Sequence, residues 1–145
     1  MQLTTKSRYA VMAILEIASN TTDSPITLST IATKQNIPIS YLEQIFAQLR
    51  KAKVVRAIKG PKGGYIIDAK LENIKIANII DAVEENIEMT RCSSKTGKRC
   101  KANNVKCNTH NLWLGLSIHI RDYLNNISVA DMLVINQNVS IYDQA

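Results

Sequence analysis

The chain has 145 residues, of which 46% are hydrophobic and 21% are charged, and its formal net charge is +6. This size allows one domain, or a small domain with an appended dimerisation element. The apolar stretch over residues 10–18 contains Glu16 and is too short to cross a bilayer, so no membrane segment is expected. The chain does not open with a basic region followed by an apolar run, which predicts a cytoplasmic location.

The positive charge is concentrated in the first half of the chain. Residues 1–65 hold nine lysines and arginines against three acidic residues, whereas residues 66–145 hold nine of each sign. A basic half beside a neutral half is typical of a module that binds a polyanion, most commonly nucleic acid. A membrane surface is the rival partner, but no strongly amphipathic helix with aromatic anchors accompanies the charge. The charge distribution therefore predicts binding to nucleic acid, which the helix-turn-helix motif below specifies as double-stranded DNA.

Three helices are predicted in the basic half. Apolar residues recur at helical spacing and predict a first helix over residues 7–19. Thr27 is expected to cap a short second helix over residues 28–34. The S-x-x-E sequence that begins at Ser40 matches a capping box and predicts a third helix over residues 41–52. The second and third helices, joined by a tight turn, form a helix-turn-helix.

A basic β-hairpin is predicted after the third helix. Residues 54–58 and 65–67 are predicted as strands, and the turn over residues 59–64 holds three glycines that would let its backbone approach a phosphate or a narrow groove. An ordinary solvated hairpin is the alternative. A helix-turn-helix followed by such a hairpin predicts a winged helix-turn-helix domain over residues 1–68. The residues expected to contact DNA are Ser40, Tyr41, Glu43, Gln44, Gln48, Lys51, Lys59 and Lys62.

Glu43 admits two interpretations. Its carboxylate can complete the capping box with Ser40. Alternatively, it can lie at the DNA-facing start of the recognition helix, where it repels phosphate unless it accepts a hydrogen bond, for instance from a cytosine amino group. In the second case Glu43 would penalise one class of DNA site. A metal group bound by the cysteine-rich stretch described below would relieve this penalty and so select among promoters.

Residues 69–145 are expected to form a second part of the chain. A fourth helix is predicted from Ile76 to near Glu85, a helix of about 18 residues after His110, and a short helix over residues 128–135. A long apolar helix beside a small DNA-binding domain typically packs against its copy, whereas burial within its own chain is the alternative. The predicted fold class is mainly α with a small β-hairpin, a winged helix-turn-helix domain plus a long dimerisation helix.

All the cysteines lie in one short stretch that ends in a histidine. The four residues are Cys92, Cys100, Cys107 and His110. An odd number of cysteines leaves one over in any disulfide scheme, so reduced thiols are expected. Thiolates and an imidazole suit zinc or an iron–sulfur cluster. Gaps of seven and six residues between the cysteines exceed the short spacing usual in structural zinc sites, which favours a cluster.

Three other interpretations of this stretch stay open. The thiols can be unrelated groups on a solvated basic loop, or the site can hold a structural zinc in a DNA-binding protein. Cys107 and His110 can also be a nucleophile and its base. No glycine-rich cradle or carboxylate pair accompanies them, and an enzyme would leave the basic half unexplained. The chain is therefore not expected to be an enzyme.

Four motifs resemble the IscR family of iron–sulfur-cluster assembly regulators. They are Leu3–Ala10, Ser40–Gln44, Gly60–Tyr65 and the segment from Arg91-Cys92 through Cys107-x2-His110-x2-Trp113. The resemblance covers nearly the whole chain and implies a homodimeric winged-helix repressor of cluster-biogenesis genes. It implies a 2Fe-2S cluster, delivered by the iron–sulfur assembly machinery. The ligands it implies are Cys92, Cys100, Cys107 and His110.

The chain departs from this family in two places. The gaps between its cysteines are longer than the usual pattern, and related three-cysteine regulators hold a 4Fe-4S cluster and sense nitric oxide, iron or redox state. The retained Cys-x2-His spacing favours 2Fe-2S. The hairpin carries Lys59 where these regulators usually show arginine. Lysine lacks the planar fork that suits a narrow minor groove, so a relaxed DNA preference is expected there.

Overall fold

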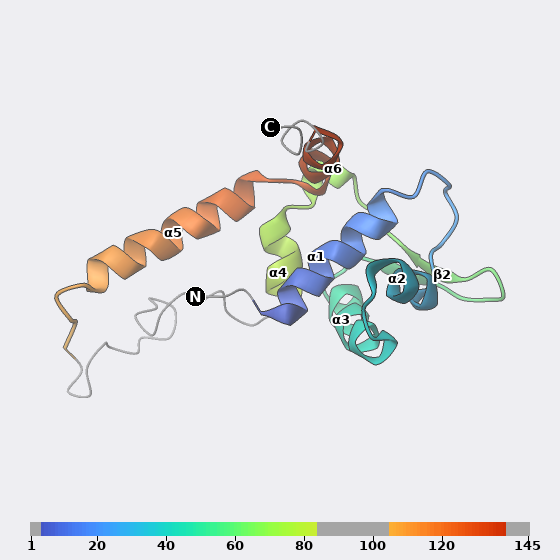
Figure 1. The fold of residues 1–145 in the computed structure, drawn as a ribbon, viewed down its shortest axis with the longest axis horizontal. Helices are drawn as coiled ribbons and strands as arrows, with labels where there is room; N and C mark the ends of the chain where they lie inside the picture. Colours follow the sequence, from blue (N-terminus) through green and yellow to red (C-terminus); the bar gives the residue numbers. More distant parts are fainter. Residues whose placement is uncertain (1–3, 84–104, 139–145) are drawn as a thin grey trace.

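The computed structural model describes residues 4–83 and 105–138, and every structural statement below concerns these residues. Its elements in chain order are α1 (Thr5–Ala18), α2 (Leu28–Gln35), α3 (Ile39–Lys51), β1 (Arg56–Ile58), β2 (Gly64–Ile66), the short 3-10 helix η1 (Leu71–Asn73), α4 (Ile76–Val83), α5 (His110–Asn126) and α6 (Val129–Asn138). Figure 1 shows the first four helices gathered together, with the hairpin at one side and α5 extending away from them. The predicted fold class, mainly helical with a small hairpin, is confirmed.

The first two helices form as the sequence predicts, with small shifts at their ends. Thr4 caps α1 by accepting a hydrogen bond from the Ser7 amide at 3.3 Å, so this helix begins two residues before the predicted start. Thr27 caps α2 in the same way, as predicted. Asn36 then adopts the left-handed conformation, with φ 53° and ψ 48°, which asparagine tolerates better than most residues. This residue ends α2 and creates the tight turn of the helix-turn-helix.

The predicted capping box at the start of α3 is wrong. The helix begins at Ile39, and the N-cap is Pro38, whose carbonyl accepts hydrogen bonds from the Tyr41 and Leu42 amides at 3.1 and 3.2 Å. The ring of Pro38 holds its φ at −57°, which directs its carbonyl toward the first turn. The helix therefore starts with hydrogen bonds to this carbonyl. Ser40 lies inside the first turn and provides no side-chain cap.

The end of α3 also determines where the hairpin begins. The Val54 amide donates to the Leu49 carbonyl at 2.9 Å, and the Lys53 amide donates to the Arg50 carbonyl at 3.0 Å. Lys53 is left-handed, with φ 59°, so the end is a Schellman motif with lysine where glycine is usual. Because Val54 completes this motif, β1 begins two residues later than predicted.

The hairpin is tied to the helices by a contact that the sequence did not reveal. Ile26, just before α2, forms an isolated bridge with Tyr65 through two backbone hydrogen bonds of 3.1 and 2.7 Å. A side chain on Gly64 would meet this segment, since an added Cβ would lie 2.5 Å from the Ile26 carbonyl oxygen. A Cβ on Gly63 would lie 2.2 Å from the Ile58 carbonyl oxygen. Gly64 is therefore required by the contact of the hairpin with Ile26, and Gly63 by the turn of the hairpin.

Gly64→Ala is expected to lower the free energy of unfolding by at least about 2 kcal/mol, because it combines a backbone clash with a φ of 154°. Urea unfolding followed by circular dichroism measures this change. Gly115→Ala is the matched control, since Gly115 lies in α5 and an added Cβ there meets nothing within 4 Å. This control should be neutral or stabilising by about 0.5–1 kcal/mol. Equal stability of the Gly64 variant and the parent protein would contradict the packing argument.

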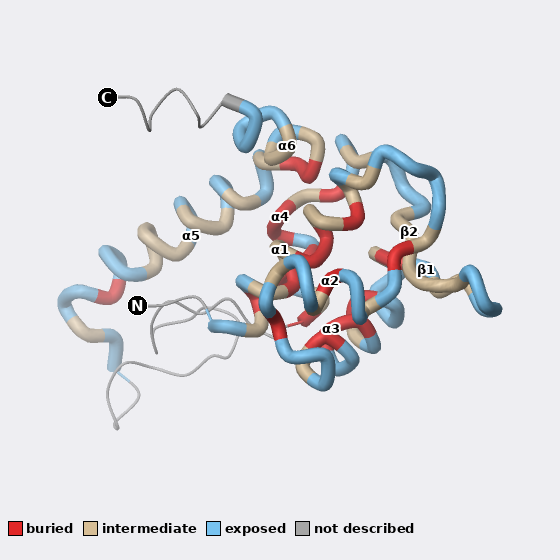
Figure 2. Tube along the Cα trace, turned by 45° about the vertical axis from the view of Figure 1, so that its right-hand side comes forward, coloured by how far each residue is buried: buried red, intermediate tan, exposed pale blue. Residues whose placement is uncertain are grey.

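A single hydrophobic core joins the basic half to the second half. Figure 2 shows buried segments on the inner sides of α1, α3 and α4. Fully buried Ile14, Phe46 and Ile79 belong to one cluster that also includes Val129 at the start of α6. The division of the chain at residue 68 remains a prediction. No helix of the described residues is long and apolar enough to span a membrane.

Helices α4 and α6 begin side by side. The Ile76 amide donates to the Ile127 carbonyl and the Val129 amide donates to the Ile74 carbonyl, both at 2.9 Å. Ser128 and Asp131 form a capping box at the start of α6, and the hydrogen bond from the Ser128 amide lowers the pKa of the Asp131 carboxyl. This helix extends three residues past its predicted end. The predicted end of α4, near residue 85, lies outside the described residues.

Candidate nucleic-acid interface and metal-ligand residues

The exposed face of α3 forms a strip along the recognition helix. Ser40, Glu43, Gln44 and Lys51 are all exposed, as predicted, and helical spacing places them on one side. Glu43 makes no hydrogen bond or ion pair with the described residues, so the capping interpretation of this carboxylate fails. The strip is therefore polar, with one acid near its start and a lysine at its end.

Tyr41 and Gln48 lie at the edge of this strip instead of on it. Both side chains are half-buried. The Tyr41 ring packs edge-on against Tyr9 of α1, with ring centroids 5.5 Å apart. The amide oxygen of Gln48 is buried and accepts no hydrogen bond from the described residues, which costs about 1–3 kcal/mol. The prediction that both residues face outward is therefore only partly right.

The hairpin presents its positive charge at the tip. Lys59 and Lys62 are exposed, and the turn between them is closed by a hydrogen bond from the Gly63 amide to the Gly60 carbonyl at 2.9 Å. At the base of the hairpin, Arg56 forms a two-point ion pair with Asp68, with N–O distances of 2.8 and 3.2 Å. Arg56 is thus neutralised by Asp68, whereas Lys59 and Lys62 form no ion pair with any acidic residue that the structure describes.

Further cations lie beside the strip. They are not among the residues that the sequence predicted to contact DNA. Arg50 is exposed on α3, next to Lys51. The contact of Tyr9 with Tyr41 brings the start of α1, which carries Lys6 and exposed Arg8, next to the start of α3. None of the first turns of α1, α2 and α3 contains an acidic residue, so the positive ends of these helices are not compensated there. The signal that pointed to these residues was the net charge of the basic half.

Two of the four predicted metal ligands lie at the start of α5. The His110 amide donates to the Cys107 carbonyl at 3.1 Å, which turns the chain into the helix and holds both residues at this end. His110 is 7% exposed and Cys107 is half-buried, with its Sγ 3.5 Å from the Thr109 hydroxyl. A thiol and an imidazole at the same end of a helix are the donor types that suit a soft metal or an iron–sulfur cluster.

The other two predicted ligands, Cys92 and Cys100, lie outside the described residues. Within residues 4–83 and 105–138, no three histidine, cysteine or acidic side chains are grouped so that they could hold a metal ion. The complete ligand set therefore remains a prediction. Its two described members, Cys107 and His110, carry side chains that can bind a soft metal.

The helix that follows these ligands exposes large apolar side chains. Leu112, Ile118 and Tyr123 are 62%, 52% and 66% exposed, and Trp113 is also partly open to solvent. Within the described residues, the later part of α5 contacts the other helices. Arg121 forms an ion pair with Asp81 of α4, which raises the pKa of the guanidinium, and Leu124 packs against the core. Burial of the whole apolar row within its own chain, the alternative left open by the sequence, is not observed in the described part of the chain.

Comparison with known proteins agrees with this arrangement. Residues 3–134 match the model of the Rrf2 family, which is described as an iron-dependent transcriptional regulator. The chain is 44% identical over 139 residues to the HTH-type transcriptional regulator IscR of Yersinia pestis, covering 96% of this chain and 82% of that protein. It is 42% identical over 144 residues to IscR of Vibrio vulnificus, covering 99% and 84%.

A solved structure supports the same assignment. The structure of T. potens IscR matches with a TM-score of 0.74 and 30% sequence identity, covering 94% of this chain and 88% of that chain. The relatives are named as transcriptional regulators and not as enzymes, so the interpretation of Cys107 as a catalytic nucleophile is set aside. The predicted DNA-binding regulator is confirmed. The chain belongs to the Rrf2 family of iron-dependent transcriptional regulators.

Proposed function

We propose that this regulator is a homodimeric, cytoplasmic repressor of iron–sulfur-cluster biogenesis genes that responds to a 2Fe-2S cluster. The observation that supports the proposal is the pairing of Cys107 with His110 at the start of α5, in a chain whose other half is a basic winged helix. Cys92 and Cys100 would complete the ligand set. When bound, the cluster would supply a group whose presence depends on iron and sulfide availability. The iron–sulfur assembly machinery is the proposed donor.

The DNA contacts follow from the exposed residues. The strip on α3 would enter the major groove with Ser40, Glu43 and Gln44 near base edges. The tip lysines of the hairpin would contact the adjacent backbone or minor groove, and the start of α1 would contact phosphate. Lys51 would lie at the far end of the strip, and the edge residues Tyr41 and Gln48 would reach DNA only from its side.

The apolar row on α5 supports the homodimer. Helical spacing places exposed Leu112, Trp113 and Tyr123 on one side of α5, and such an apolar face is stable in water when a second copy covers it. Two copies related by a two-fold axis would present two recognition helices to half-sites about 34–36 Å apart, or a multiple of one helical turn.

The experiment that tests this function compares DNA binding by cluster-loaded and cluster-free protein. The full chain, purified without oxygen, is titrated with promoter DNA by fluorescence anisotropy, and its mass is measured by sedimentation. We expect a dimer whose affinity for at least one class of site changes at least about fivefold when the cluster is removed. A monomer, or equal affinity of both forms for every site, would reject the proposal. A related three-cysteine regulator with a 4Fe-4S cluster and a zinc-stabilised DNA-binding protein are the alternatives, and metal analysis distinguishes them.

Glu43→Ala is expected to change DNA preference without changing stability. Glu43 is exposed and caps nothing, so its removal should alter the free energy of unfolding by less than about 0.5 kcal/mol. Without the carboxylate, cluster-free protein should gain affinity for sites that the parent binds only with its cluster, by roughly tenfold or more. Binding to both site classes and thermal unfolding are measured together.

Glu43→Gln is the matched control, because it keeps the shape of the side chain and removes the charge. If repulsion of phosphate is the cause, this variant should gain the same sites as Glu43→Ala. A uniform loss of affinity for both classes, accompanied by lower thermal stability, would refute the role of Glu43 in excluding DNA sites.

A further inference from the structure

An ion pair connects α5 to α4 at two points. Arg121 Nη1 donates to Asp81 Oδ1 at 2.6 Å, and Nη2 donates to Oδ2 of the same carboxylate. The two side chains are 32% and 39% exposed, and the residues are 40 positions apart in the sequence. A planar guanidinium bound through two parallel hydrogen bonds resists rotation, unlike the single contact of a flexible lysine. The ion pair therefore fixes this part of α5 to α4 in a more defined orientation than a single lysine contact would.

The helix that receives this shift is part of the DNA-binding core. Ile76, Ile79, Ile80 and Val83 of α4 are buried in the cluster that contains α1 and α3. Asp81 lies on the opposite side of α4, where it meets α5. The apolar side of α4 is packed against this core over its described residues, Ile76–Val83, so a displacement of α4 would be felt by the core. Helix α4 lies between the helix that begins with Cys107 and His110 and the recognition helix.

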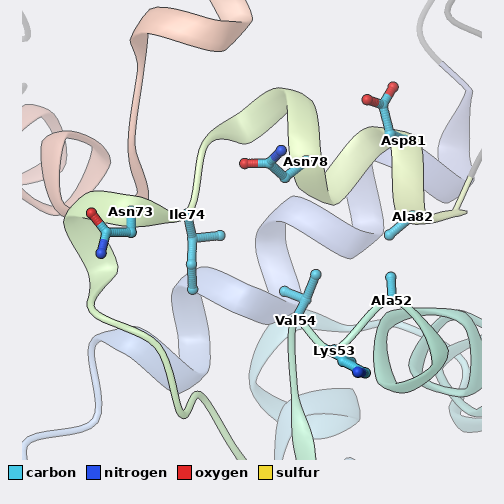
Figure 3. Close-up of a pocket in the computed structure, with 8 residues that line it drawn as sticks. All are labelled: Ala52, Lys53, Val54, Asn73, Ile74, Asn78, Asp81 and Ala82. Carbon is cyan, nitrogen blue, oxygen red and sulfur yellow. The ribbon is translucent and has the colours of Figure 1, made fainter.

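A cleft lies between α4 and the end of the recognition helix. Its volume is about 400 Å³, and Figure 3 shows it between the turn Ala52–Val54, which ends α3, and the segment Asn73–Ala82. Ala52 and Ala82 point toward one another across it, while Asp81 points away. The cleft is open to solvent, so the residues that line it are not packed against one another, although α3 and α4 share the same buried core. The turn at this cleft connects the recognition helix to the hairpin, and a movement there alters both.

We infer that Arg121 and Asp81 are positioning residues that transmit the state of the ligand-bearing start of α5 to α4, and across the cleft to the recognition helix. This inference rests on the proposed function, because the state transmitted is the presence of the cluster. Arg121 lies about three helical turns beyond His110 on α5, so neither residue of the ion pair is proposed as a ligand or as a DNA contact. A partly exposed ion pair of this kind accounts for a change in coupling of about two- to fivefold.

The test uses full-length protein and the ratio of DNA dissociation constants with and without the cluster. Arg121→Gln and Asp81→Asn should each bring this ratio about two- to fivefold closer to one, and the double variant should add nothing further, because both changes break the same link. Iron and sulfide content should stay at the parent level. Lys34→Gln is the matched control, since it breaks a 2.7 Å ion pair with Glu16 between α1 and α2 and should leave the ratio unchanged.

Two further measurements separate coupling from loss of structure. Ala82→Met extends a side chain into the cleft while keeping the ion pair, and it should also bring the ratio closer to one without lowering thermal stability. In cluster-free protein, hydrogen exchange of the α4 amides should become faster in Arg121→Gln while that of α2 is unchanged.

The outcomes separate this inference from the proposed function. A parent protein that responds to its cluster, together with an unchanged ratio in Arg121→Gln and Asp81→Asn, overturns the coupling role and leaves the function intact. If Lys34→Gln brings the ratio equally close to one, the coupling role is also overturned, because general destabilisation would then explain the effect. A parent protein that holds no cluster, or whose affinity ignores the cluster, rejects the function and the inference together.

Discussion

The affinity of this protein for DNA is expected to fall at least roughly 1,000-fold between about 50 mM and about 200 mM salt. The chain carries several cations on α1, α3 and the hairpin turn: Lys6, Arg8, Arg50, Lys51, Lys59 and Lys62. A dimer that neutralises six to ten phosphates with these side chains releases a similar number of counterions, which gives the steep dependence. Anisotropy titrations of an unrelated duplex and of a promoter duplex at several salt concentrations measure it.

Substitutions at the hairpin tip refine this expectation. Lys59→Ala or Lys62→Ala should make the slope of log affinity against log salt about two units less steep in the dimer, because each change removes one phosphate contact per protomer. Lys34→Gln is the control, since Lys34 is held by Glu16, and this variant should leave the slope unchanged. Affinity that stays flat over the same salt range would contradict the assignment of the basic half to DNA.

Replacing Cys107 with alanine is expected to remove the cluster completely while the dimer stays folded. The side chain is half-buried at the start of α5, and the residues that hold this helix, Arg121 and Leu124, lie more than two turns away. Cys92→Ala and Cys100→Ala should have the same effect, since a cluster that loses one protein ligand is generally not retained. Iron and sulfide analysis, visible absorption and circular dichroism measure the outcome.

Thr109→Ala is the matched control for Cys107→Ala. The Thr109 hydroxyl lies 3.5 Å from the Cys107 sulfur, so its removal perturbs the same turn without removing a thiolate. The control should keep its iron and sulfide. Any cysteine variant that retains the iron and sulfide content of the parent would exclude that residue from the ligand set, and unfolding of the dimer would show that the residue has a structural role.

The helices and the hairpin could be predicted because their signals are local. Apolar residues at helical spacing identified α1, α3 and α5, and the glycine-rich turn identified the hairpin. The start of α3 was predicted wrongly because the S-x-x-E pattern at Ser40 competes with the carbonyl of Pro38, and a pattern cannot show which one forms the first hydrogen bonds. The bridge between Ile26 and Tyr65 involves single residues far apart in sequence, which leave no periodic signal.

The candidate site was predicted by residue type more reliably than by orientation. Four α3 residues predicted to contact DNA are exposed, but the inward amide oxygen of Gln48 and the packing of Tyr41 depend on neighbouring helices that no single segment encodes. The Asp81–Arg121 ion pair had no sequence signal for the same reason, since its partners are 40 residues apart. The cysteine spacing identified the candidate ligands, of which Cys107 and His110 lie together at the start of α5.

The visible absorption spectrum of full-length protein purified without oxygen tests the central claim most directly, with iron and sulfide measured on the same sample. A 2Fe-2S regulator should be coloured, with broad charge-transfer bands, and should contain about two irons and two sulfides per protomer. Cys107→Ala protein prepared in parallel should be colourless. A colourless parent protein that contains zinc and no iron would contradict the proposed cluster, whereas its assignment to the Rrf2 family would stand.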